Sequence, residues 1–170
     1  MSKFVEKFQV VQAIVPIDFS SGDNVGDYVN MANYTSCVFI VSTDVGTAGD
    51  DIVIDATQAT SAAGAGDKAL TKITRIDHKV GATAISAVGT FTTVTQTAAA
   101  SYDSVAIDEA ENQALLIVEV MAADLDTNNG FDFLKFDVAD TGTNAGHMGS
   151  AIYILTGARY PQATLTSAIA

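Results

Sequence analysis

The sequence has few of the residues that mark a disulfide scaffold or a nucleic-acid-binding protein. It contains one cysteine, Cys37, and no tryptophan. A single cysteine excludes an intramolecular disulfide, and its place in the apolar run SCVFIV favours a buried thiol over a nucleophile. The eight basic residues are scattered, and 20 acidic residues give a net charge of -12. Because nucleic-acid binding needs a positive stripe on the surface, we expect no direct contact with DNA or RNA.

Long hydrophobic runs are also missing. The longest, such as ALLIV, fall far short of the ~20 apolar residues that a membrane-spanning helix needs. The first residues, MSKFVEKFQVV, are interrupted by Glu6 and Lys7, so they do not form the apolar segment of a signal peptide. The sequence therefore predicts a protein without membrane contact.

Short strands dominate what is present. Runs of Val, Ile, Thr and Ala are interrupted at short intervals by Asp, Asn and Gly, which is typical of strands joined by turns. Since no crossover helices stand out, the pattern predicts an all-β protein, an antiparallel jelly-roll-like β-sandwich of about eight strands. We expect a single domain over 1–170, with an N-terminal arm at 1–20 and a C-terminal tail at 158–170. The expected strands are 8–15, 36–42, 51–57, 69–77, 90–96, 114–122, 131–138 and 151–157.

Three segments allow more than one interpretation. The apolar spacing over residues 4–15 also fits a short helix that ends before Pro16. Residues 104–113 could hold a helical turn. The apolar side of the strand expected at 131–138 changes near Leu134, which either a β-bulge or a strand that passes from one core to another would explain.

Three runs are apolar on both faces of the expected strand: 37–41, 114–118 and 151–155. A strand with one wet face should alternate apolar and polar residues. Either an arm of the same chain or a neighbouring subunit must therefore cover the second face, and we expect a homo-oligomer, with a trimer favoured. The candidate residues for an oligomer or capsid interface are Phe39, Val41, Leu115, Ile117, Tyr153, Leu155, Arg159 and Tyr160.

Two stretches between expected strands consist almost entirely of small residues, TSAAGAG and TQTAAAS. They are too short and too small-sided to form a core of their own. Such segments are either loops that become ordered against a partner or solvated connections, and the sequence leaves both open.

A possible cation site is the clearest local signal of chemistry. Asp124, Asp126 and Asn128 have the one-three-five spacing of a calcium loop. The pattern then fails, because Gly130 comes one place late and Lys135 stands where a bidentate Glu should fall. We therefore expect an Asx-stabilised turn without metal, and calcium is the weaker alternative.

No complete catalytic motif is present. His78 and His147 have no Cys or His at zinc-ligand spacing. Asp77 precedes His78 directly, but neighbouring strand residues point to opposite faces. No Gly-x-Ser-x-Gly elbow supports a serine nucleophile. We expect no catalytic residues, no cofactor and no enzymatic activity.

Several blocks, taken together and in order, resemble a family of virion structural proteins of tailed bacteriophages and prophages, similar to capsid decoration (cement) proteins. The resemblance covers most of residues 28–165. Commoner members of the family have a Pro after the position of Asp51, which this chain lacks. It implies a jelly-roll sandwich that sits on the capsid as a trimer or dimer, and it carries over no catalytic residue. The blocks are MANYTSCVFIV, GTAGDDIVIDATQATSAAGAGDKAL, ADLDTNNGFDFLKFDV and ARYPQAT.

The function expected on these grounds is that of a decoration protein. It would bind the phage major capsid protein on the outer surface of the virion head, after assembly in the host cytoplasm, and stabilise the expanded shell. One alternative is a tail or fibre-associated structural module, which would show an exposed aromatic groove. A small virion hydrolase is the other, and it would need His78 or His147 to meet carboxylates in a cleft.

Overall fold

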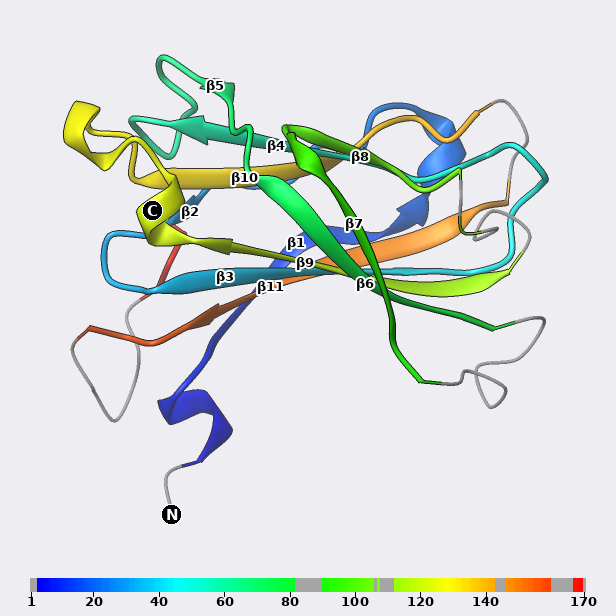
Figure 1. The fold of residues 1–170 in the computed structure, drawn as a ribbon, viewed down its shortest axis with the longest axis horizontal. Helices are drawn as coiled ribbons and strands as arrows, with labels where there is room; N and C mark the ends of the chain where they lie inside the picture. The colour runs from blue at the N-terminus through cyan, green and yellow to red at the C-terminus, as the bar shows by residue number, and fades with distance from the viewer. Residues whose placement is uncertain are drawn as a thin grey trace.

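Two antiparallel β-sheets lie face to face in the computed structural model of the chain (Figure 1). The structure describes residues 3–81, 90–105, 107, 112–142, 146–159 and 167–169. In these residues the chain is an all-β sandwich. The strands are β1 (Gln9–Asp18), β2 (Val29–Asn30), β3 (Ser36–Thr43), β4 (Val53–Ala59), β5 (Lys68–Ala69), β6 (Ile73–Gly81), β7 (Thr92–Ala99), β8 (Ser101–Asp103), β9 (Gln113–Met121), β10 (Phe133–Val138) and β11 (Met148–Thr156). The 3-10 turns are η1 (Phe4–Glu6), η2 (Phe19–Ser21), η4 (Ala122–Asp124) and η5 (Thr127–Asn129).

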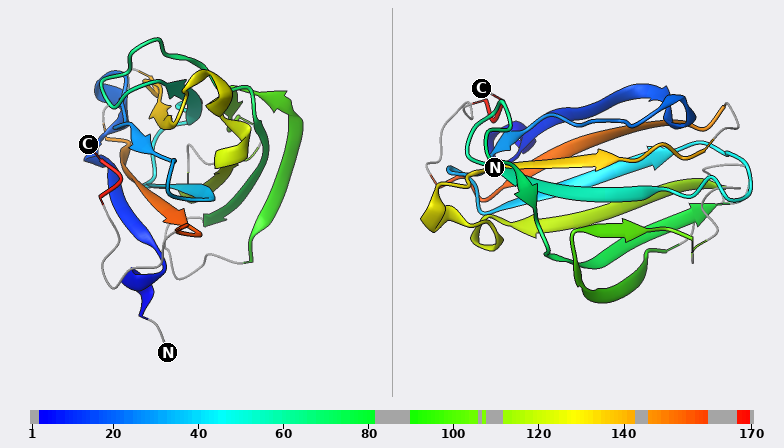
Figure 2. Two further views of the ribbon diagram at one scale, coloured as in Figure 1. Left: turned by 90° about the vertical axis from the view of Figure 1, so that its left-hand side faces the viewer. Right: turned by 90° about the horizontal axis from the view of Figure 1, so that it is seen from above.

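The larger sheet has six strands in the order β1-β11-β3-β9-β6-β7. The smaller sheet has five, in the order β2-β10-β4-β5, with β8 also paired to β4. Many neighbours are far apart in the chain, since β1 pairs with β11 and β3 pairs with β9. The turned views of Figure 2 show the two layers and the short turn η1 that precedes β1.

All eight expected segments contain a strand, and the prediction of an antiparallel β-sandwich is confirmed. The jelly-roll connectivity stays a prediction. The sequence missed β2, β5 and β8, because strands of two or three residues are too short to show a period-two pattern. Half of residues 104–113 lie outside the described part of the chain, and among the others the backbone N–H of Ile107 donates to the carbonyl of Ser104 at 2.8 Å, as in a single turn.

The start of the chain is a strand rather than a helix. Only η1 is helical there, and β1 runs along the edge of the larger sheet beside β11. Pro16 is tolerated because an edge strand leaves its outer backbone groups unpaired, and the register shifts between Ile14 and Ile17. Of the arm expected at 1–20, residues 9–18 therefore belong to the sheet, and only the described residues before Gln9 stand apart.

Of the two explanations for a change of apolar side near Leu134, the β-bulge is wrong. The pairing of β10 with β4 runs without a shift from Phe133 opposite Ala59 to Val138 opposite Ile54. Along β10 the buried residues alternate regularly with half-buried ones. The apparent change of side has another origin: Phe131 lies in the turn before β10, and Phe133, the first residue of β10, is half-buried on the side opposite Leu134.

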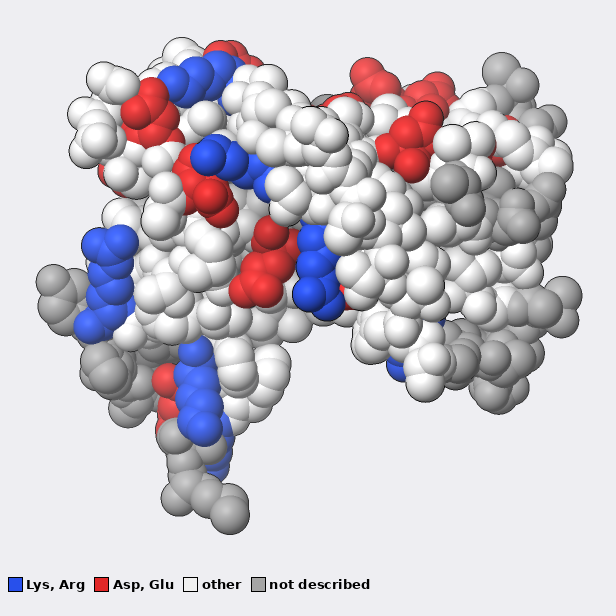
Figure 3. All heavy atoms as spheres, in the orientation of Figure 1, with Lys and Arg blue, Asp and Glu red and all other residues white. Residues whose placement is uncertain are grey.

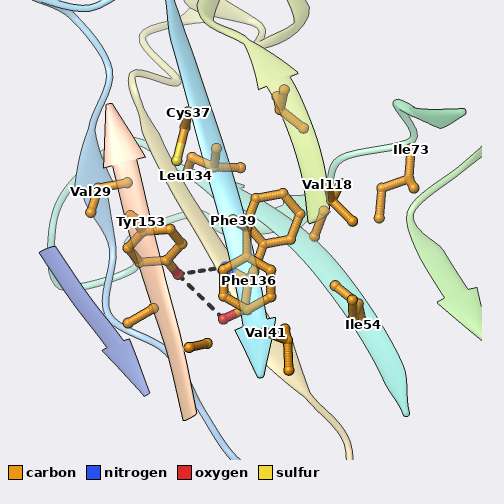
Figure 4. Packing of buried hydrophobic residues seen from close by; sticks show 14 of the residues in the cluster. Val29, Cys37, Phe39, Val41, Ile54, Ile73, Val118, Leu134, Phe136 and Tyr153 are labelled. Atoms are coloured by element: carbon orange, nitrogen blue, oxygen red, sulfur yellow. Dashed lines mark hydrogen bonds between the residues drawn. The ribbon is translucent and has the colours of Figure 1, made fainter. Parts of the chain in front are cut away.

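The core joins the two sheets through aromatic rings (Figure 4). Phe39 on β3 stacks on Phe136 on β10, with ring centroids 4.7 Å apart and planes 11° apart. The hydroxyl of Tyr153 accepts a hydrogen bond from the Phe136 backbone N–H at 2.9 Å, which satisfies a polar group inside the core. The ring of Phe19 lies directly against Gly149, where any side chain would collide with it. These contacts belong to one cluster of buried hydrophobic residues.

The end of the chain returns to the sandwich. Ala168 is buried, and its carbonyl accepts a hydrogen bond from the backbone N–H of Asn30 on β2 at 2.8 Å. Part of the C-terminal tail expected at 158–170 is thus docked on the smaller sheet. Residues 160–166 of that tail lie outside the described part of the chain.

Candidate interaction surface

Three adjacent strands of the larger sheet, β11, β3 and β9, carry apolar side chains on both faces, as the sequence predicts. The residues that point inward are buried in the core. The residues that point outward are half-buried, and no described element of the chain pairs with them from outside. We call these outward residues the apolar face: Val38, Ile40, Leu115, Ile117, Ile152 and Ile154.

The strand register places the apolar face in continuous rows. Ile40 lies opposite Ile152 on one side and Ile117 on the other. Val38 lies opposite Ile154, and Val10 of β1, with 45% of its surface exposed, extends that row to the sheet edge. Directly opposed side chains on one face of a sheet touch one another. The rows therefore form one apolar surface, which is bordered by Glu119 opposite Val38 and by Ser42 opposite Leu115.

Four of the interface candidates named from the sequence are wrong. Phe39, Val41, Tyr153 and Leu155 are fully buried in the core, so they have no surface to offer a partner. In a strand that is apolar on both faces, the residues at odd and at even positions are equally apolar. Alternation therefore does not distinguish the inward residues of β3 and β11 from the outward ones, and the four candidates are inward residues.

The other four interface candidates do not lie in the core of the described structure. Leu115 and Ile117 lie on the apolar face and stay candidates. Arg159 is exposed beyond the end of β11, where its backbone N–H donates to the carbonyl of Asn33 at 2.9 Å. Tyr160 lies outside the described residues.

Charged residues border the apolar face on β6. Asp77 lies opposite Ile117, and Lys79 lies opposite Leu115. The Arg75 guanidinium sits 2.9 Å from the Asp77 carboxylate and holds the pKa of that carboxyl below its ordinary value. The pair is open to solvent, so it contributes little to stability and mainly gives the surface a polar border.

A hollow lies at each end of the apolar face. The first, of about 490 Å³, is lined in part by Ser42, Leu115 and Ser150. The second, of about 650 Å³, is lined in part by Ile117 and Glu119. Both are open depressions in a sheet surface, which suits contact with side chains of another protein segment.

The outer face of the smaller sheet is polar by comparison. Lys135 on β10 sits 2.8 Å from the carboxylate of Asp137 and lies over the ring of Tyr28. Asp55 and Thr57 point outward on the neighbouring strand β4. On the side of the molecule visible in Figure 3, many basic side chains likewise lie beside acidic ones. The smaller sheet therefore needs no cover on its outer side.

The small-residue loop after β4 folds back on its own chain. The backbone N–H of Thr60 donates to the carbonyl of Ala65 at 3.0 Å, and the N–H of Gly64 donates to Ser61 at 3.0 Å. Gly64 has a φ of 77°, and a side-chain carbon there would meet the Tyr28 ring at 2.9 Å. Small residues therefore let this loop lie against Tyr28. Contact of the loop with a partner stays a prediction.

The calcium-like motif forms the expected turn. The Asp126 carboxylate accepts a hydrogen bond from the Asn129 amide at 2.9 Å and lies 2.6 Å from Lys68. The Asp124 carboxylate accepts a bond from the Met121 N–H at 3.1 Å, and Gly130 takes a left-handed conformation. Within the described residues, no group of three or more His, Cys, Asp and Glu side chains could hold a metal. The Asp124 carboxylate therefore caps η4, and the Asp126 carboxylate is an ion-pair partner without a cap bond to the backbone of η5.

Neither histidine faces a surface site. His78 points inward from β6 while Asp77 points outward, as the strand alternation predicts. His147 is 0% exposed, and burial lowers its pKa more than the nearby Asp50, Asp18 and Asp44 raise it. Although carboxylates surround His147, its burial leaves no path for a substrate.

The thiol of Cys37 is buried between the sheets, as the sequence predicts. Burial raises the pKa of this thiol, so it stays protonated and behaves as a small hydrophobic group. No helix within the described residues is long and apolar enough to cross a membrane.

The chain matches none of the protein-family models to which it was compared, and no curated protein matches it. The candidate site therefore rests on the geometry of the apolar face and its charged border.

Proposed function

We propose that the protein is a structural component of a tailed-bacteriophage virion, a decoration protein that binds the outer head surface and stabilises the expanded shell. The apolar face is the observation that supports the oligomeric form of this protein, because a second copy would cover it. Three neighbouring strands expose an apolar surface, which soluble chains rarely leave uncovered. The resemblance of the sequence blocks to virion proteins supplies the setting.

The proposed mechanism is stabilisation by binding. An expanded phage head is a thin protein shell that packed DNA pushes outward. A protein that bridges adjacent subunits adds contact area only in the assembled state, so it shifts the equilibrium toward the intact shell. The phage major capsid protein is the proposed partner, and a homotrimer is the proposed form of the decoration protein.

The charge of the chain supports an outer position. Its net charge of -12 would repel packed DNA and favours a place on the outside of the shell. A non-enzymatic role is proposed for the same molecule, because His147 is buried and His78 points into the core. We propose no cofactor.

The proposal is tested with heads that lack the protein. Purified protein is mixed with expanded heads at micromolar concentration, the heads are pelleted, and their resistance to heat and osmotic shock is measured. Binding together with higher resistance is expected. Protein that stays in the supernatant, or that binds without changing resistance, would exclude the decoration role and favour a tail or fibre module.

A further inference from the structure

The residues before β1 form a short arm that stands away from the sandwich. In Figures 1 and 2, η1 lies on the side of the larger sheet that faces away from the smaller sheet. Phe4 and Val5 on this arm are 55% and 63% exposed. We call residues 3–8 the N-terminal arm. It leaves the sheet on the same side as the apolar face.

The N-terminal arm is ordered by its own contacts. The N–H groups of Lys7 and Phe8 donate to the Phe4 carbonyl at 3.0 Å each. The rings of Phe4 and Phe8 lie 4.7 Å apart. No hydrogen bond or ring contact within the described residues joins this arm to the apolar face of its own copy. Because the arm already has a defined shape, little conformational entropy is lost when it binds.

We infer that the apolar face of one copy receives the N-terminal arm of another copy of this chain. The inference deepens the proposed homo-oligomer and concerns contact between copies only. It predicts that η1 lies across β11, β3 and β9 of a neighbour, with Phe4 and Val5 against Ile40 and Ile117.

The area of the apolar face supports this contact. Strands lie ~4.8 Å apart and side chains on one face repeat every ~6.7 Å, so the six residues of the apolar face together with Val10 cover about 220 Å². A specific interface between whole subunits buries about 800 Å² per partner. The apolar face is much smaller than this and fits a short segment such as the arm, because one buried Phe side chain covers roughly 150–250 Å².

Charge supports the same occupant. Four bases of the chain take part in ion pairs among the described residues, and Lys3, Lys7, Lys79 and Arg159 do not. Asp44 and Glu119 border the two hollows and form no ion pair among those residues, although Lys79 lines the hollow of Asp44 and Arg75 lines that of Glu119. Two copies with a net charge of -12 repel each other, and lysines placed near these carboxylates reduce that repulsion.

An arm that binds the face of the next copy makes a head-to-tail contact. Each copy offers one arm and one apolar face, so a closed ring satisfies every arm and every face. A trimer is the expected ring. This contact would also cover the second faces of the strands that are apolar on both sides.

The first test compares two valines that are equally exposed. Val5 on the arm and Val25 between η2 and β2 are each 63% exposed, so neither supports the core. Val5→Asp should reduce the mass measured by light scattering toward the 17.6 kDa of one chain, whereas Val25→Asp should keep the wild-type mass. Ile117→Asp should act like Val5→Asp, and circular dichroism verifies that each variant is folded. A wild-type mass for Val5→Asp, or a monomeric wild type, overturns the inference.

The second test places the arm on the face directly. Val5→Cys protein is mixed with Ile117→Cys protein under mild oxidation, and the expected product is a disulfide-linked pair. Val25→Cys mixed with Ile117→Cys should link at least tenfold less. Equal yields overturn the inference.

Head binding separates this inference from the proposed function. A monomeric Val5→Asp variant that still binds heads supports the arm contact between copies. If the variant keeps its oligomeric mass but loses head binding, the arm contacts the shell instead, and the inference is wrong while the decoration role survives. If wild-type protein forms the ring but never binds heads, the inference stands and the decoration role falls.

Discussion

The outer faces of the two sheets differ although their inner faces share one core. On the larger sheet the outward residues at the centre of β11, β3 and β9 are Val, Ile and Leu, and Ser42, Ser150 and Glu119 lie outward toward the strand ends. On the smaller sheet the outward residues of β10 and β4 include Lys135, Asp137 and Asp55, and Tyr28 with the small-residue loop lies nearby. In a single copy Lys135 and Asp137 on the outer face of the smaller sheet pair with each other, whereas the side chains of the apolar face stay partly exposed. This difference is the reason why contact with another protein is proposed for the larger sheet and not for the smaller one.

The largest effect should come from the inner side of β3. Phe39→Ala removes the ring that stacks on Phe136 and should lower the free energy of unfolding by about 3–5 kcal/mol. Ile40→Ala, one residue away on the apolar face, should cost about 1 kcal/mol in the monomer, because Ile40 is only half-buried there. Urea denaturation at low protein concentration measures both. Equal losses would show that the two sides of β3 are equally enclosed in one copy.

Acid should affect the core before it affects the outer faces. Burial lowers the pKa of His147 and His78 below the ordinary value of 6.5, so the unfolded chain takes up more protons as the pH falls through that value. The free energy of unfolding should therefore fall as the pH drops from 6.5 toward the folded pKa values, and then level off.

The carboxylate of Asp77 at the border of the apolar face has a lowered pKa and stays charged in this range. Between pH 7 and pH 5 the free energy of unfolding should therefore fall, whereas the mass of the oligomer measured by light scattering should change little. His147→Gln should flatten the stability curve, and His78→Gln should flatten it further. A curve that is unchanged in the double variant would assign the pH dependence to other groups.

A smaller effect is expected at the loop beside the smaller sheet. Gly64→Ala forces a side-chain carbon against the Tyr28 ring at a positive φ, which should cost about 1–2 kcal/mol. Gly66 also has a positive φ, but only Thr60 lies near it, at 3.9 Å, so Gly66→Ala should cost less. Thermal unfolding of the two variants measures the contribution of the Tyr28 contact. Equal costs would mean that backbone conformation alone requires glycine in this loop.

The smallest effects should come from the ion pairs of the two outer faces. Lys135→Gln breaks a partly buried pair on the smaller sheet and should cost about 1 kcal/mol. Arg75→Gln breaks a solvent-exposed pair beside the apolar face and should cost less than about 0.5 kcal/mol. Urea denaturation in low and high salt measures both, with the larger salt effect expected for the Arg75 pair. A greater loss for Arg75→Gln would mean that this border is shielded from solvent.

Local sequence patterns are enough to place the main strands and to show which of them are apolar on both sides. Period-two alternation and turn residues located the eight main strands, and the apolar run around Cys37 indicated a buried thiol. The same local rules explain why Asp77 and His78 point in opposite directions. These rules depend only on residues that are neighbours in the chain, so a single sequence is enough to apply them.

Which side of β3 and β11 faces inward depends on packing between the two sheets. Both sides are apolar, so alternation alone does not separate Phe39 from Ile40 or Tyr153 from Ile152. The choice is made across the core, where Phe136 of the other sheet stacks on Phe39 and its N–H donates to the hydroxyl of Tyr153. The burial of His147 and the contact of Gly64 with Tyr28 were decided in the same way. Such contacts join residues far apart in the chain, and the period of a single strand holds no information about them.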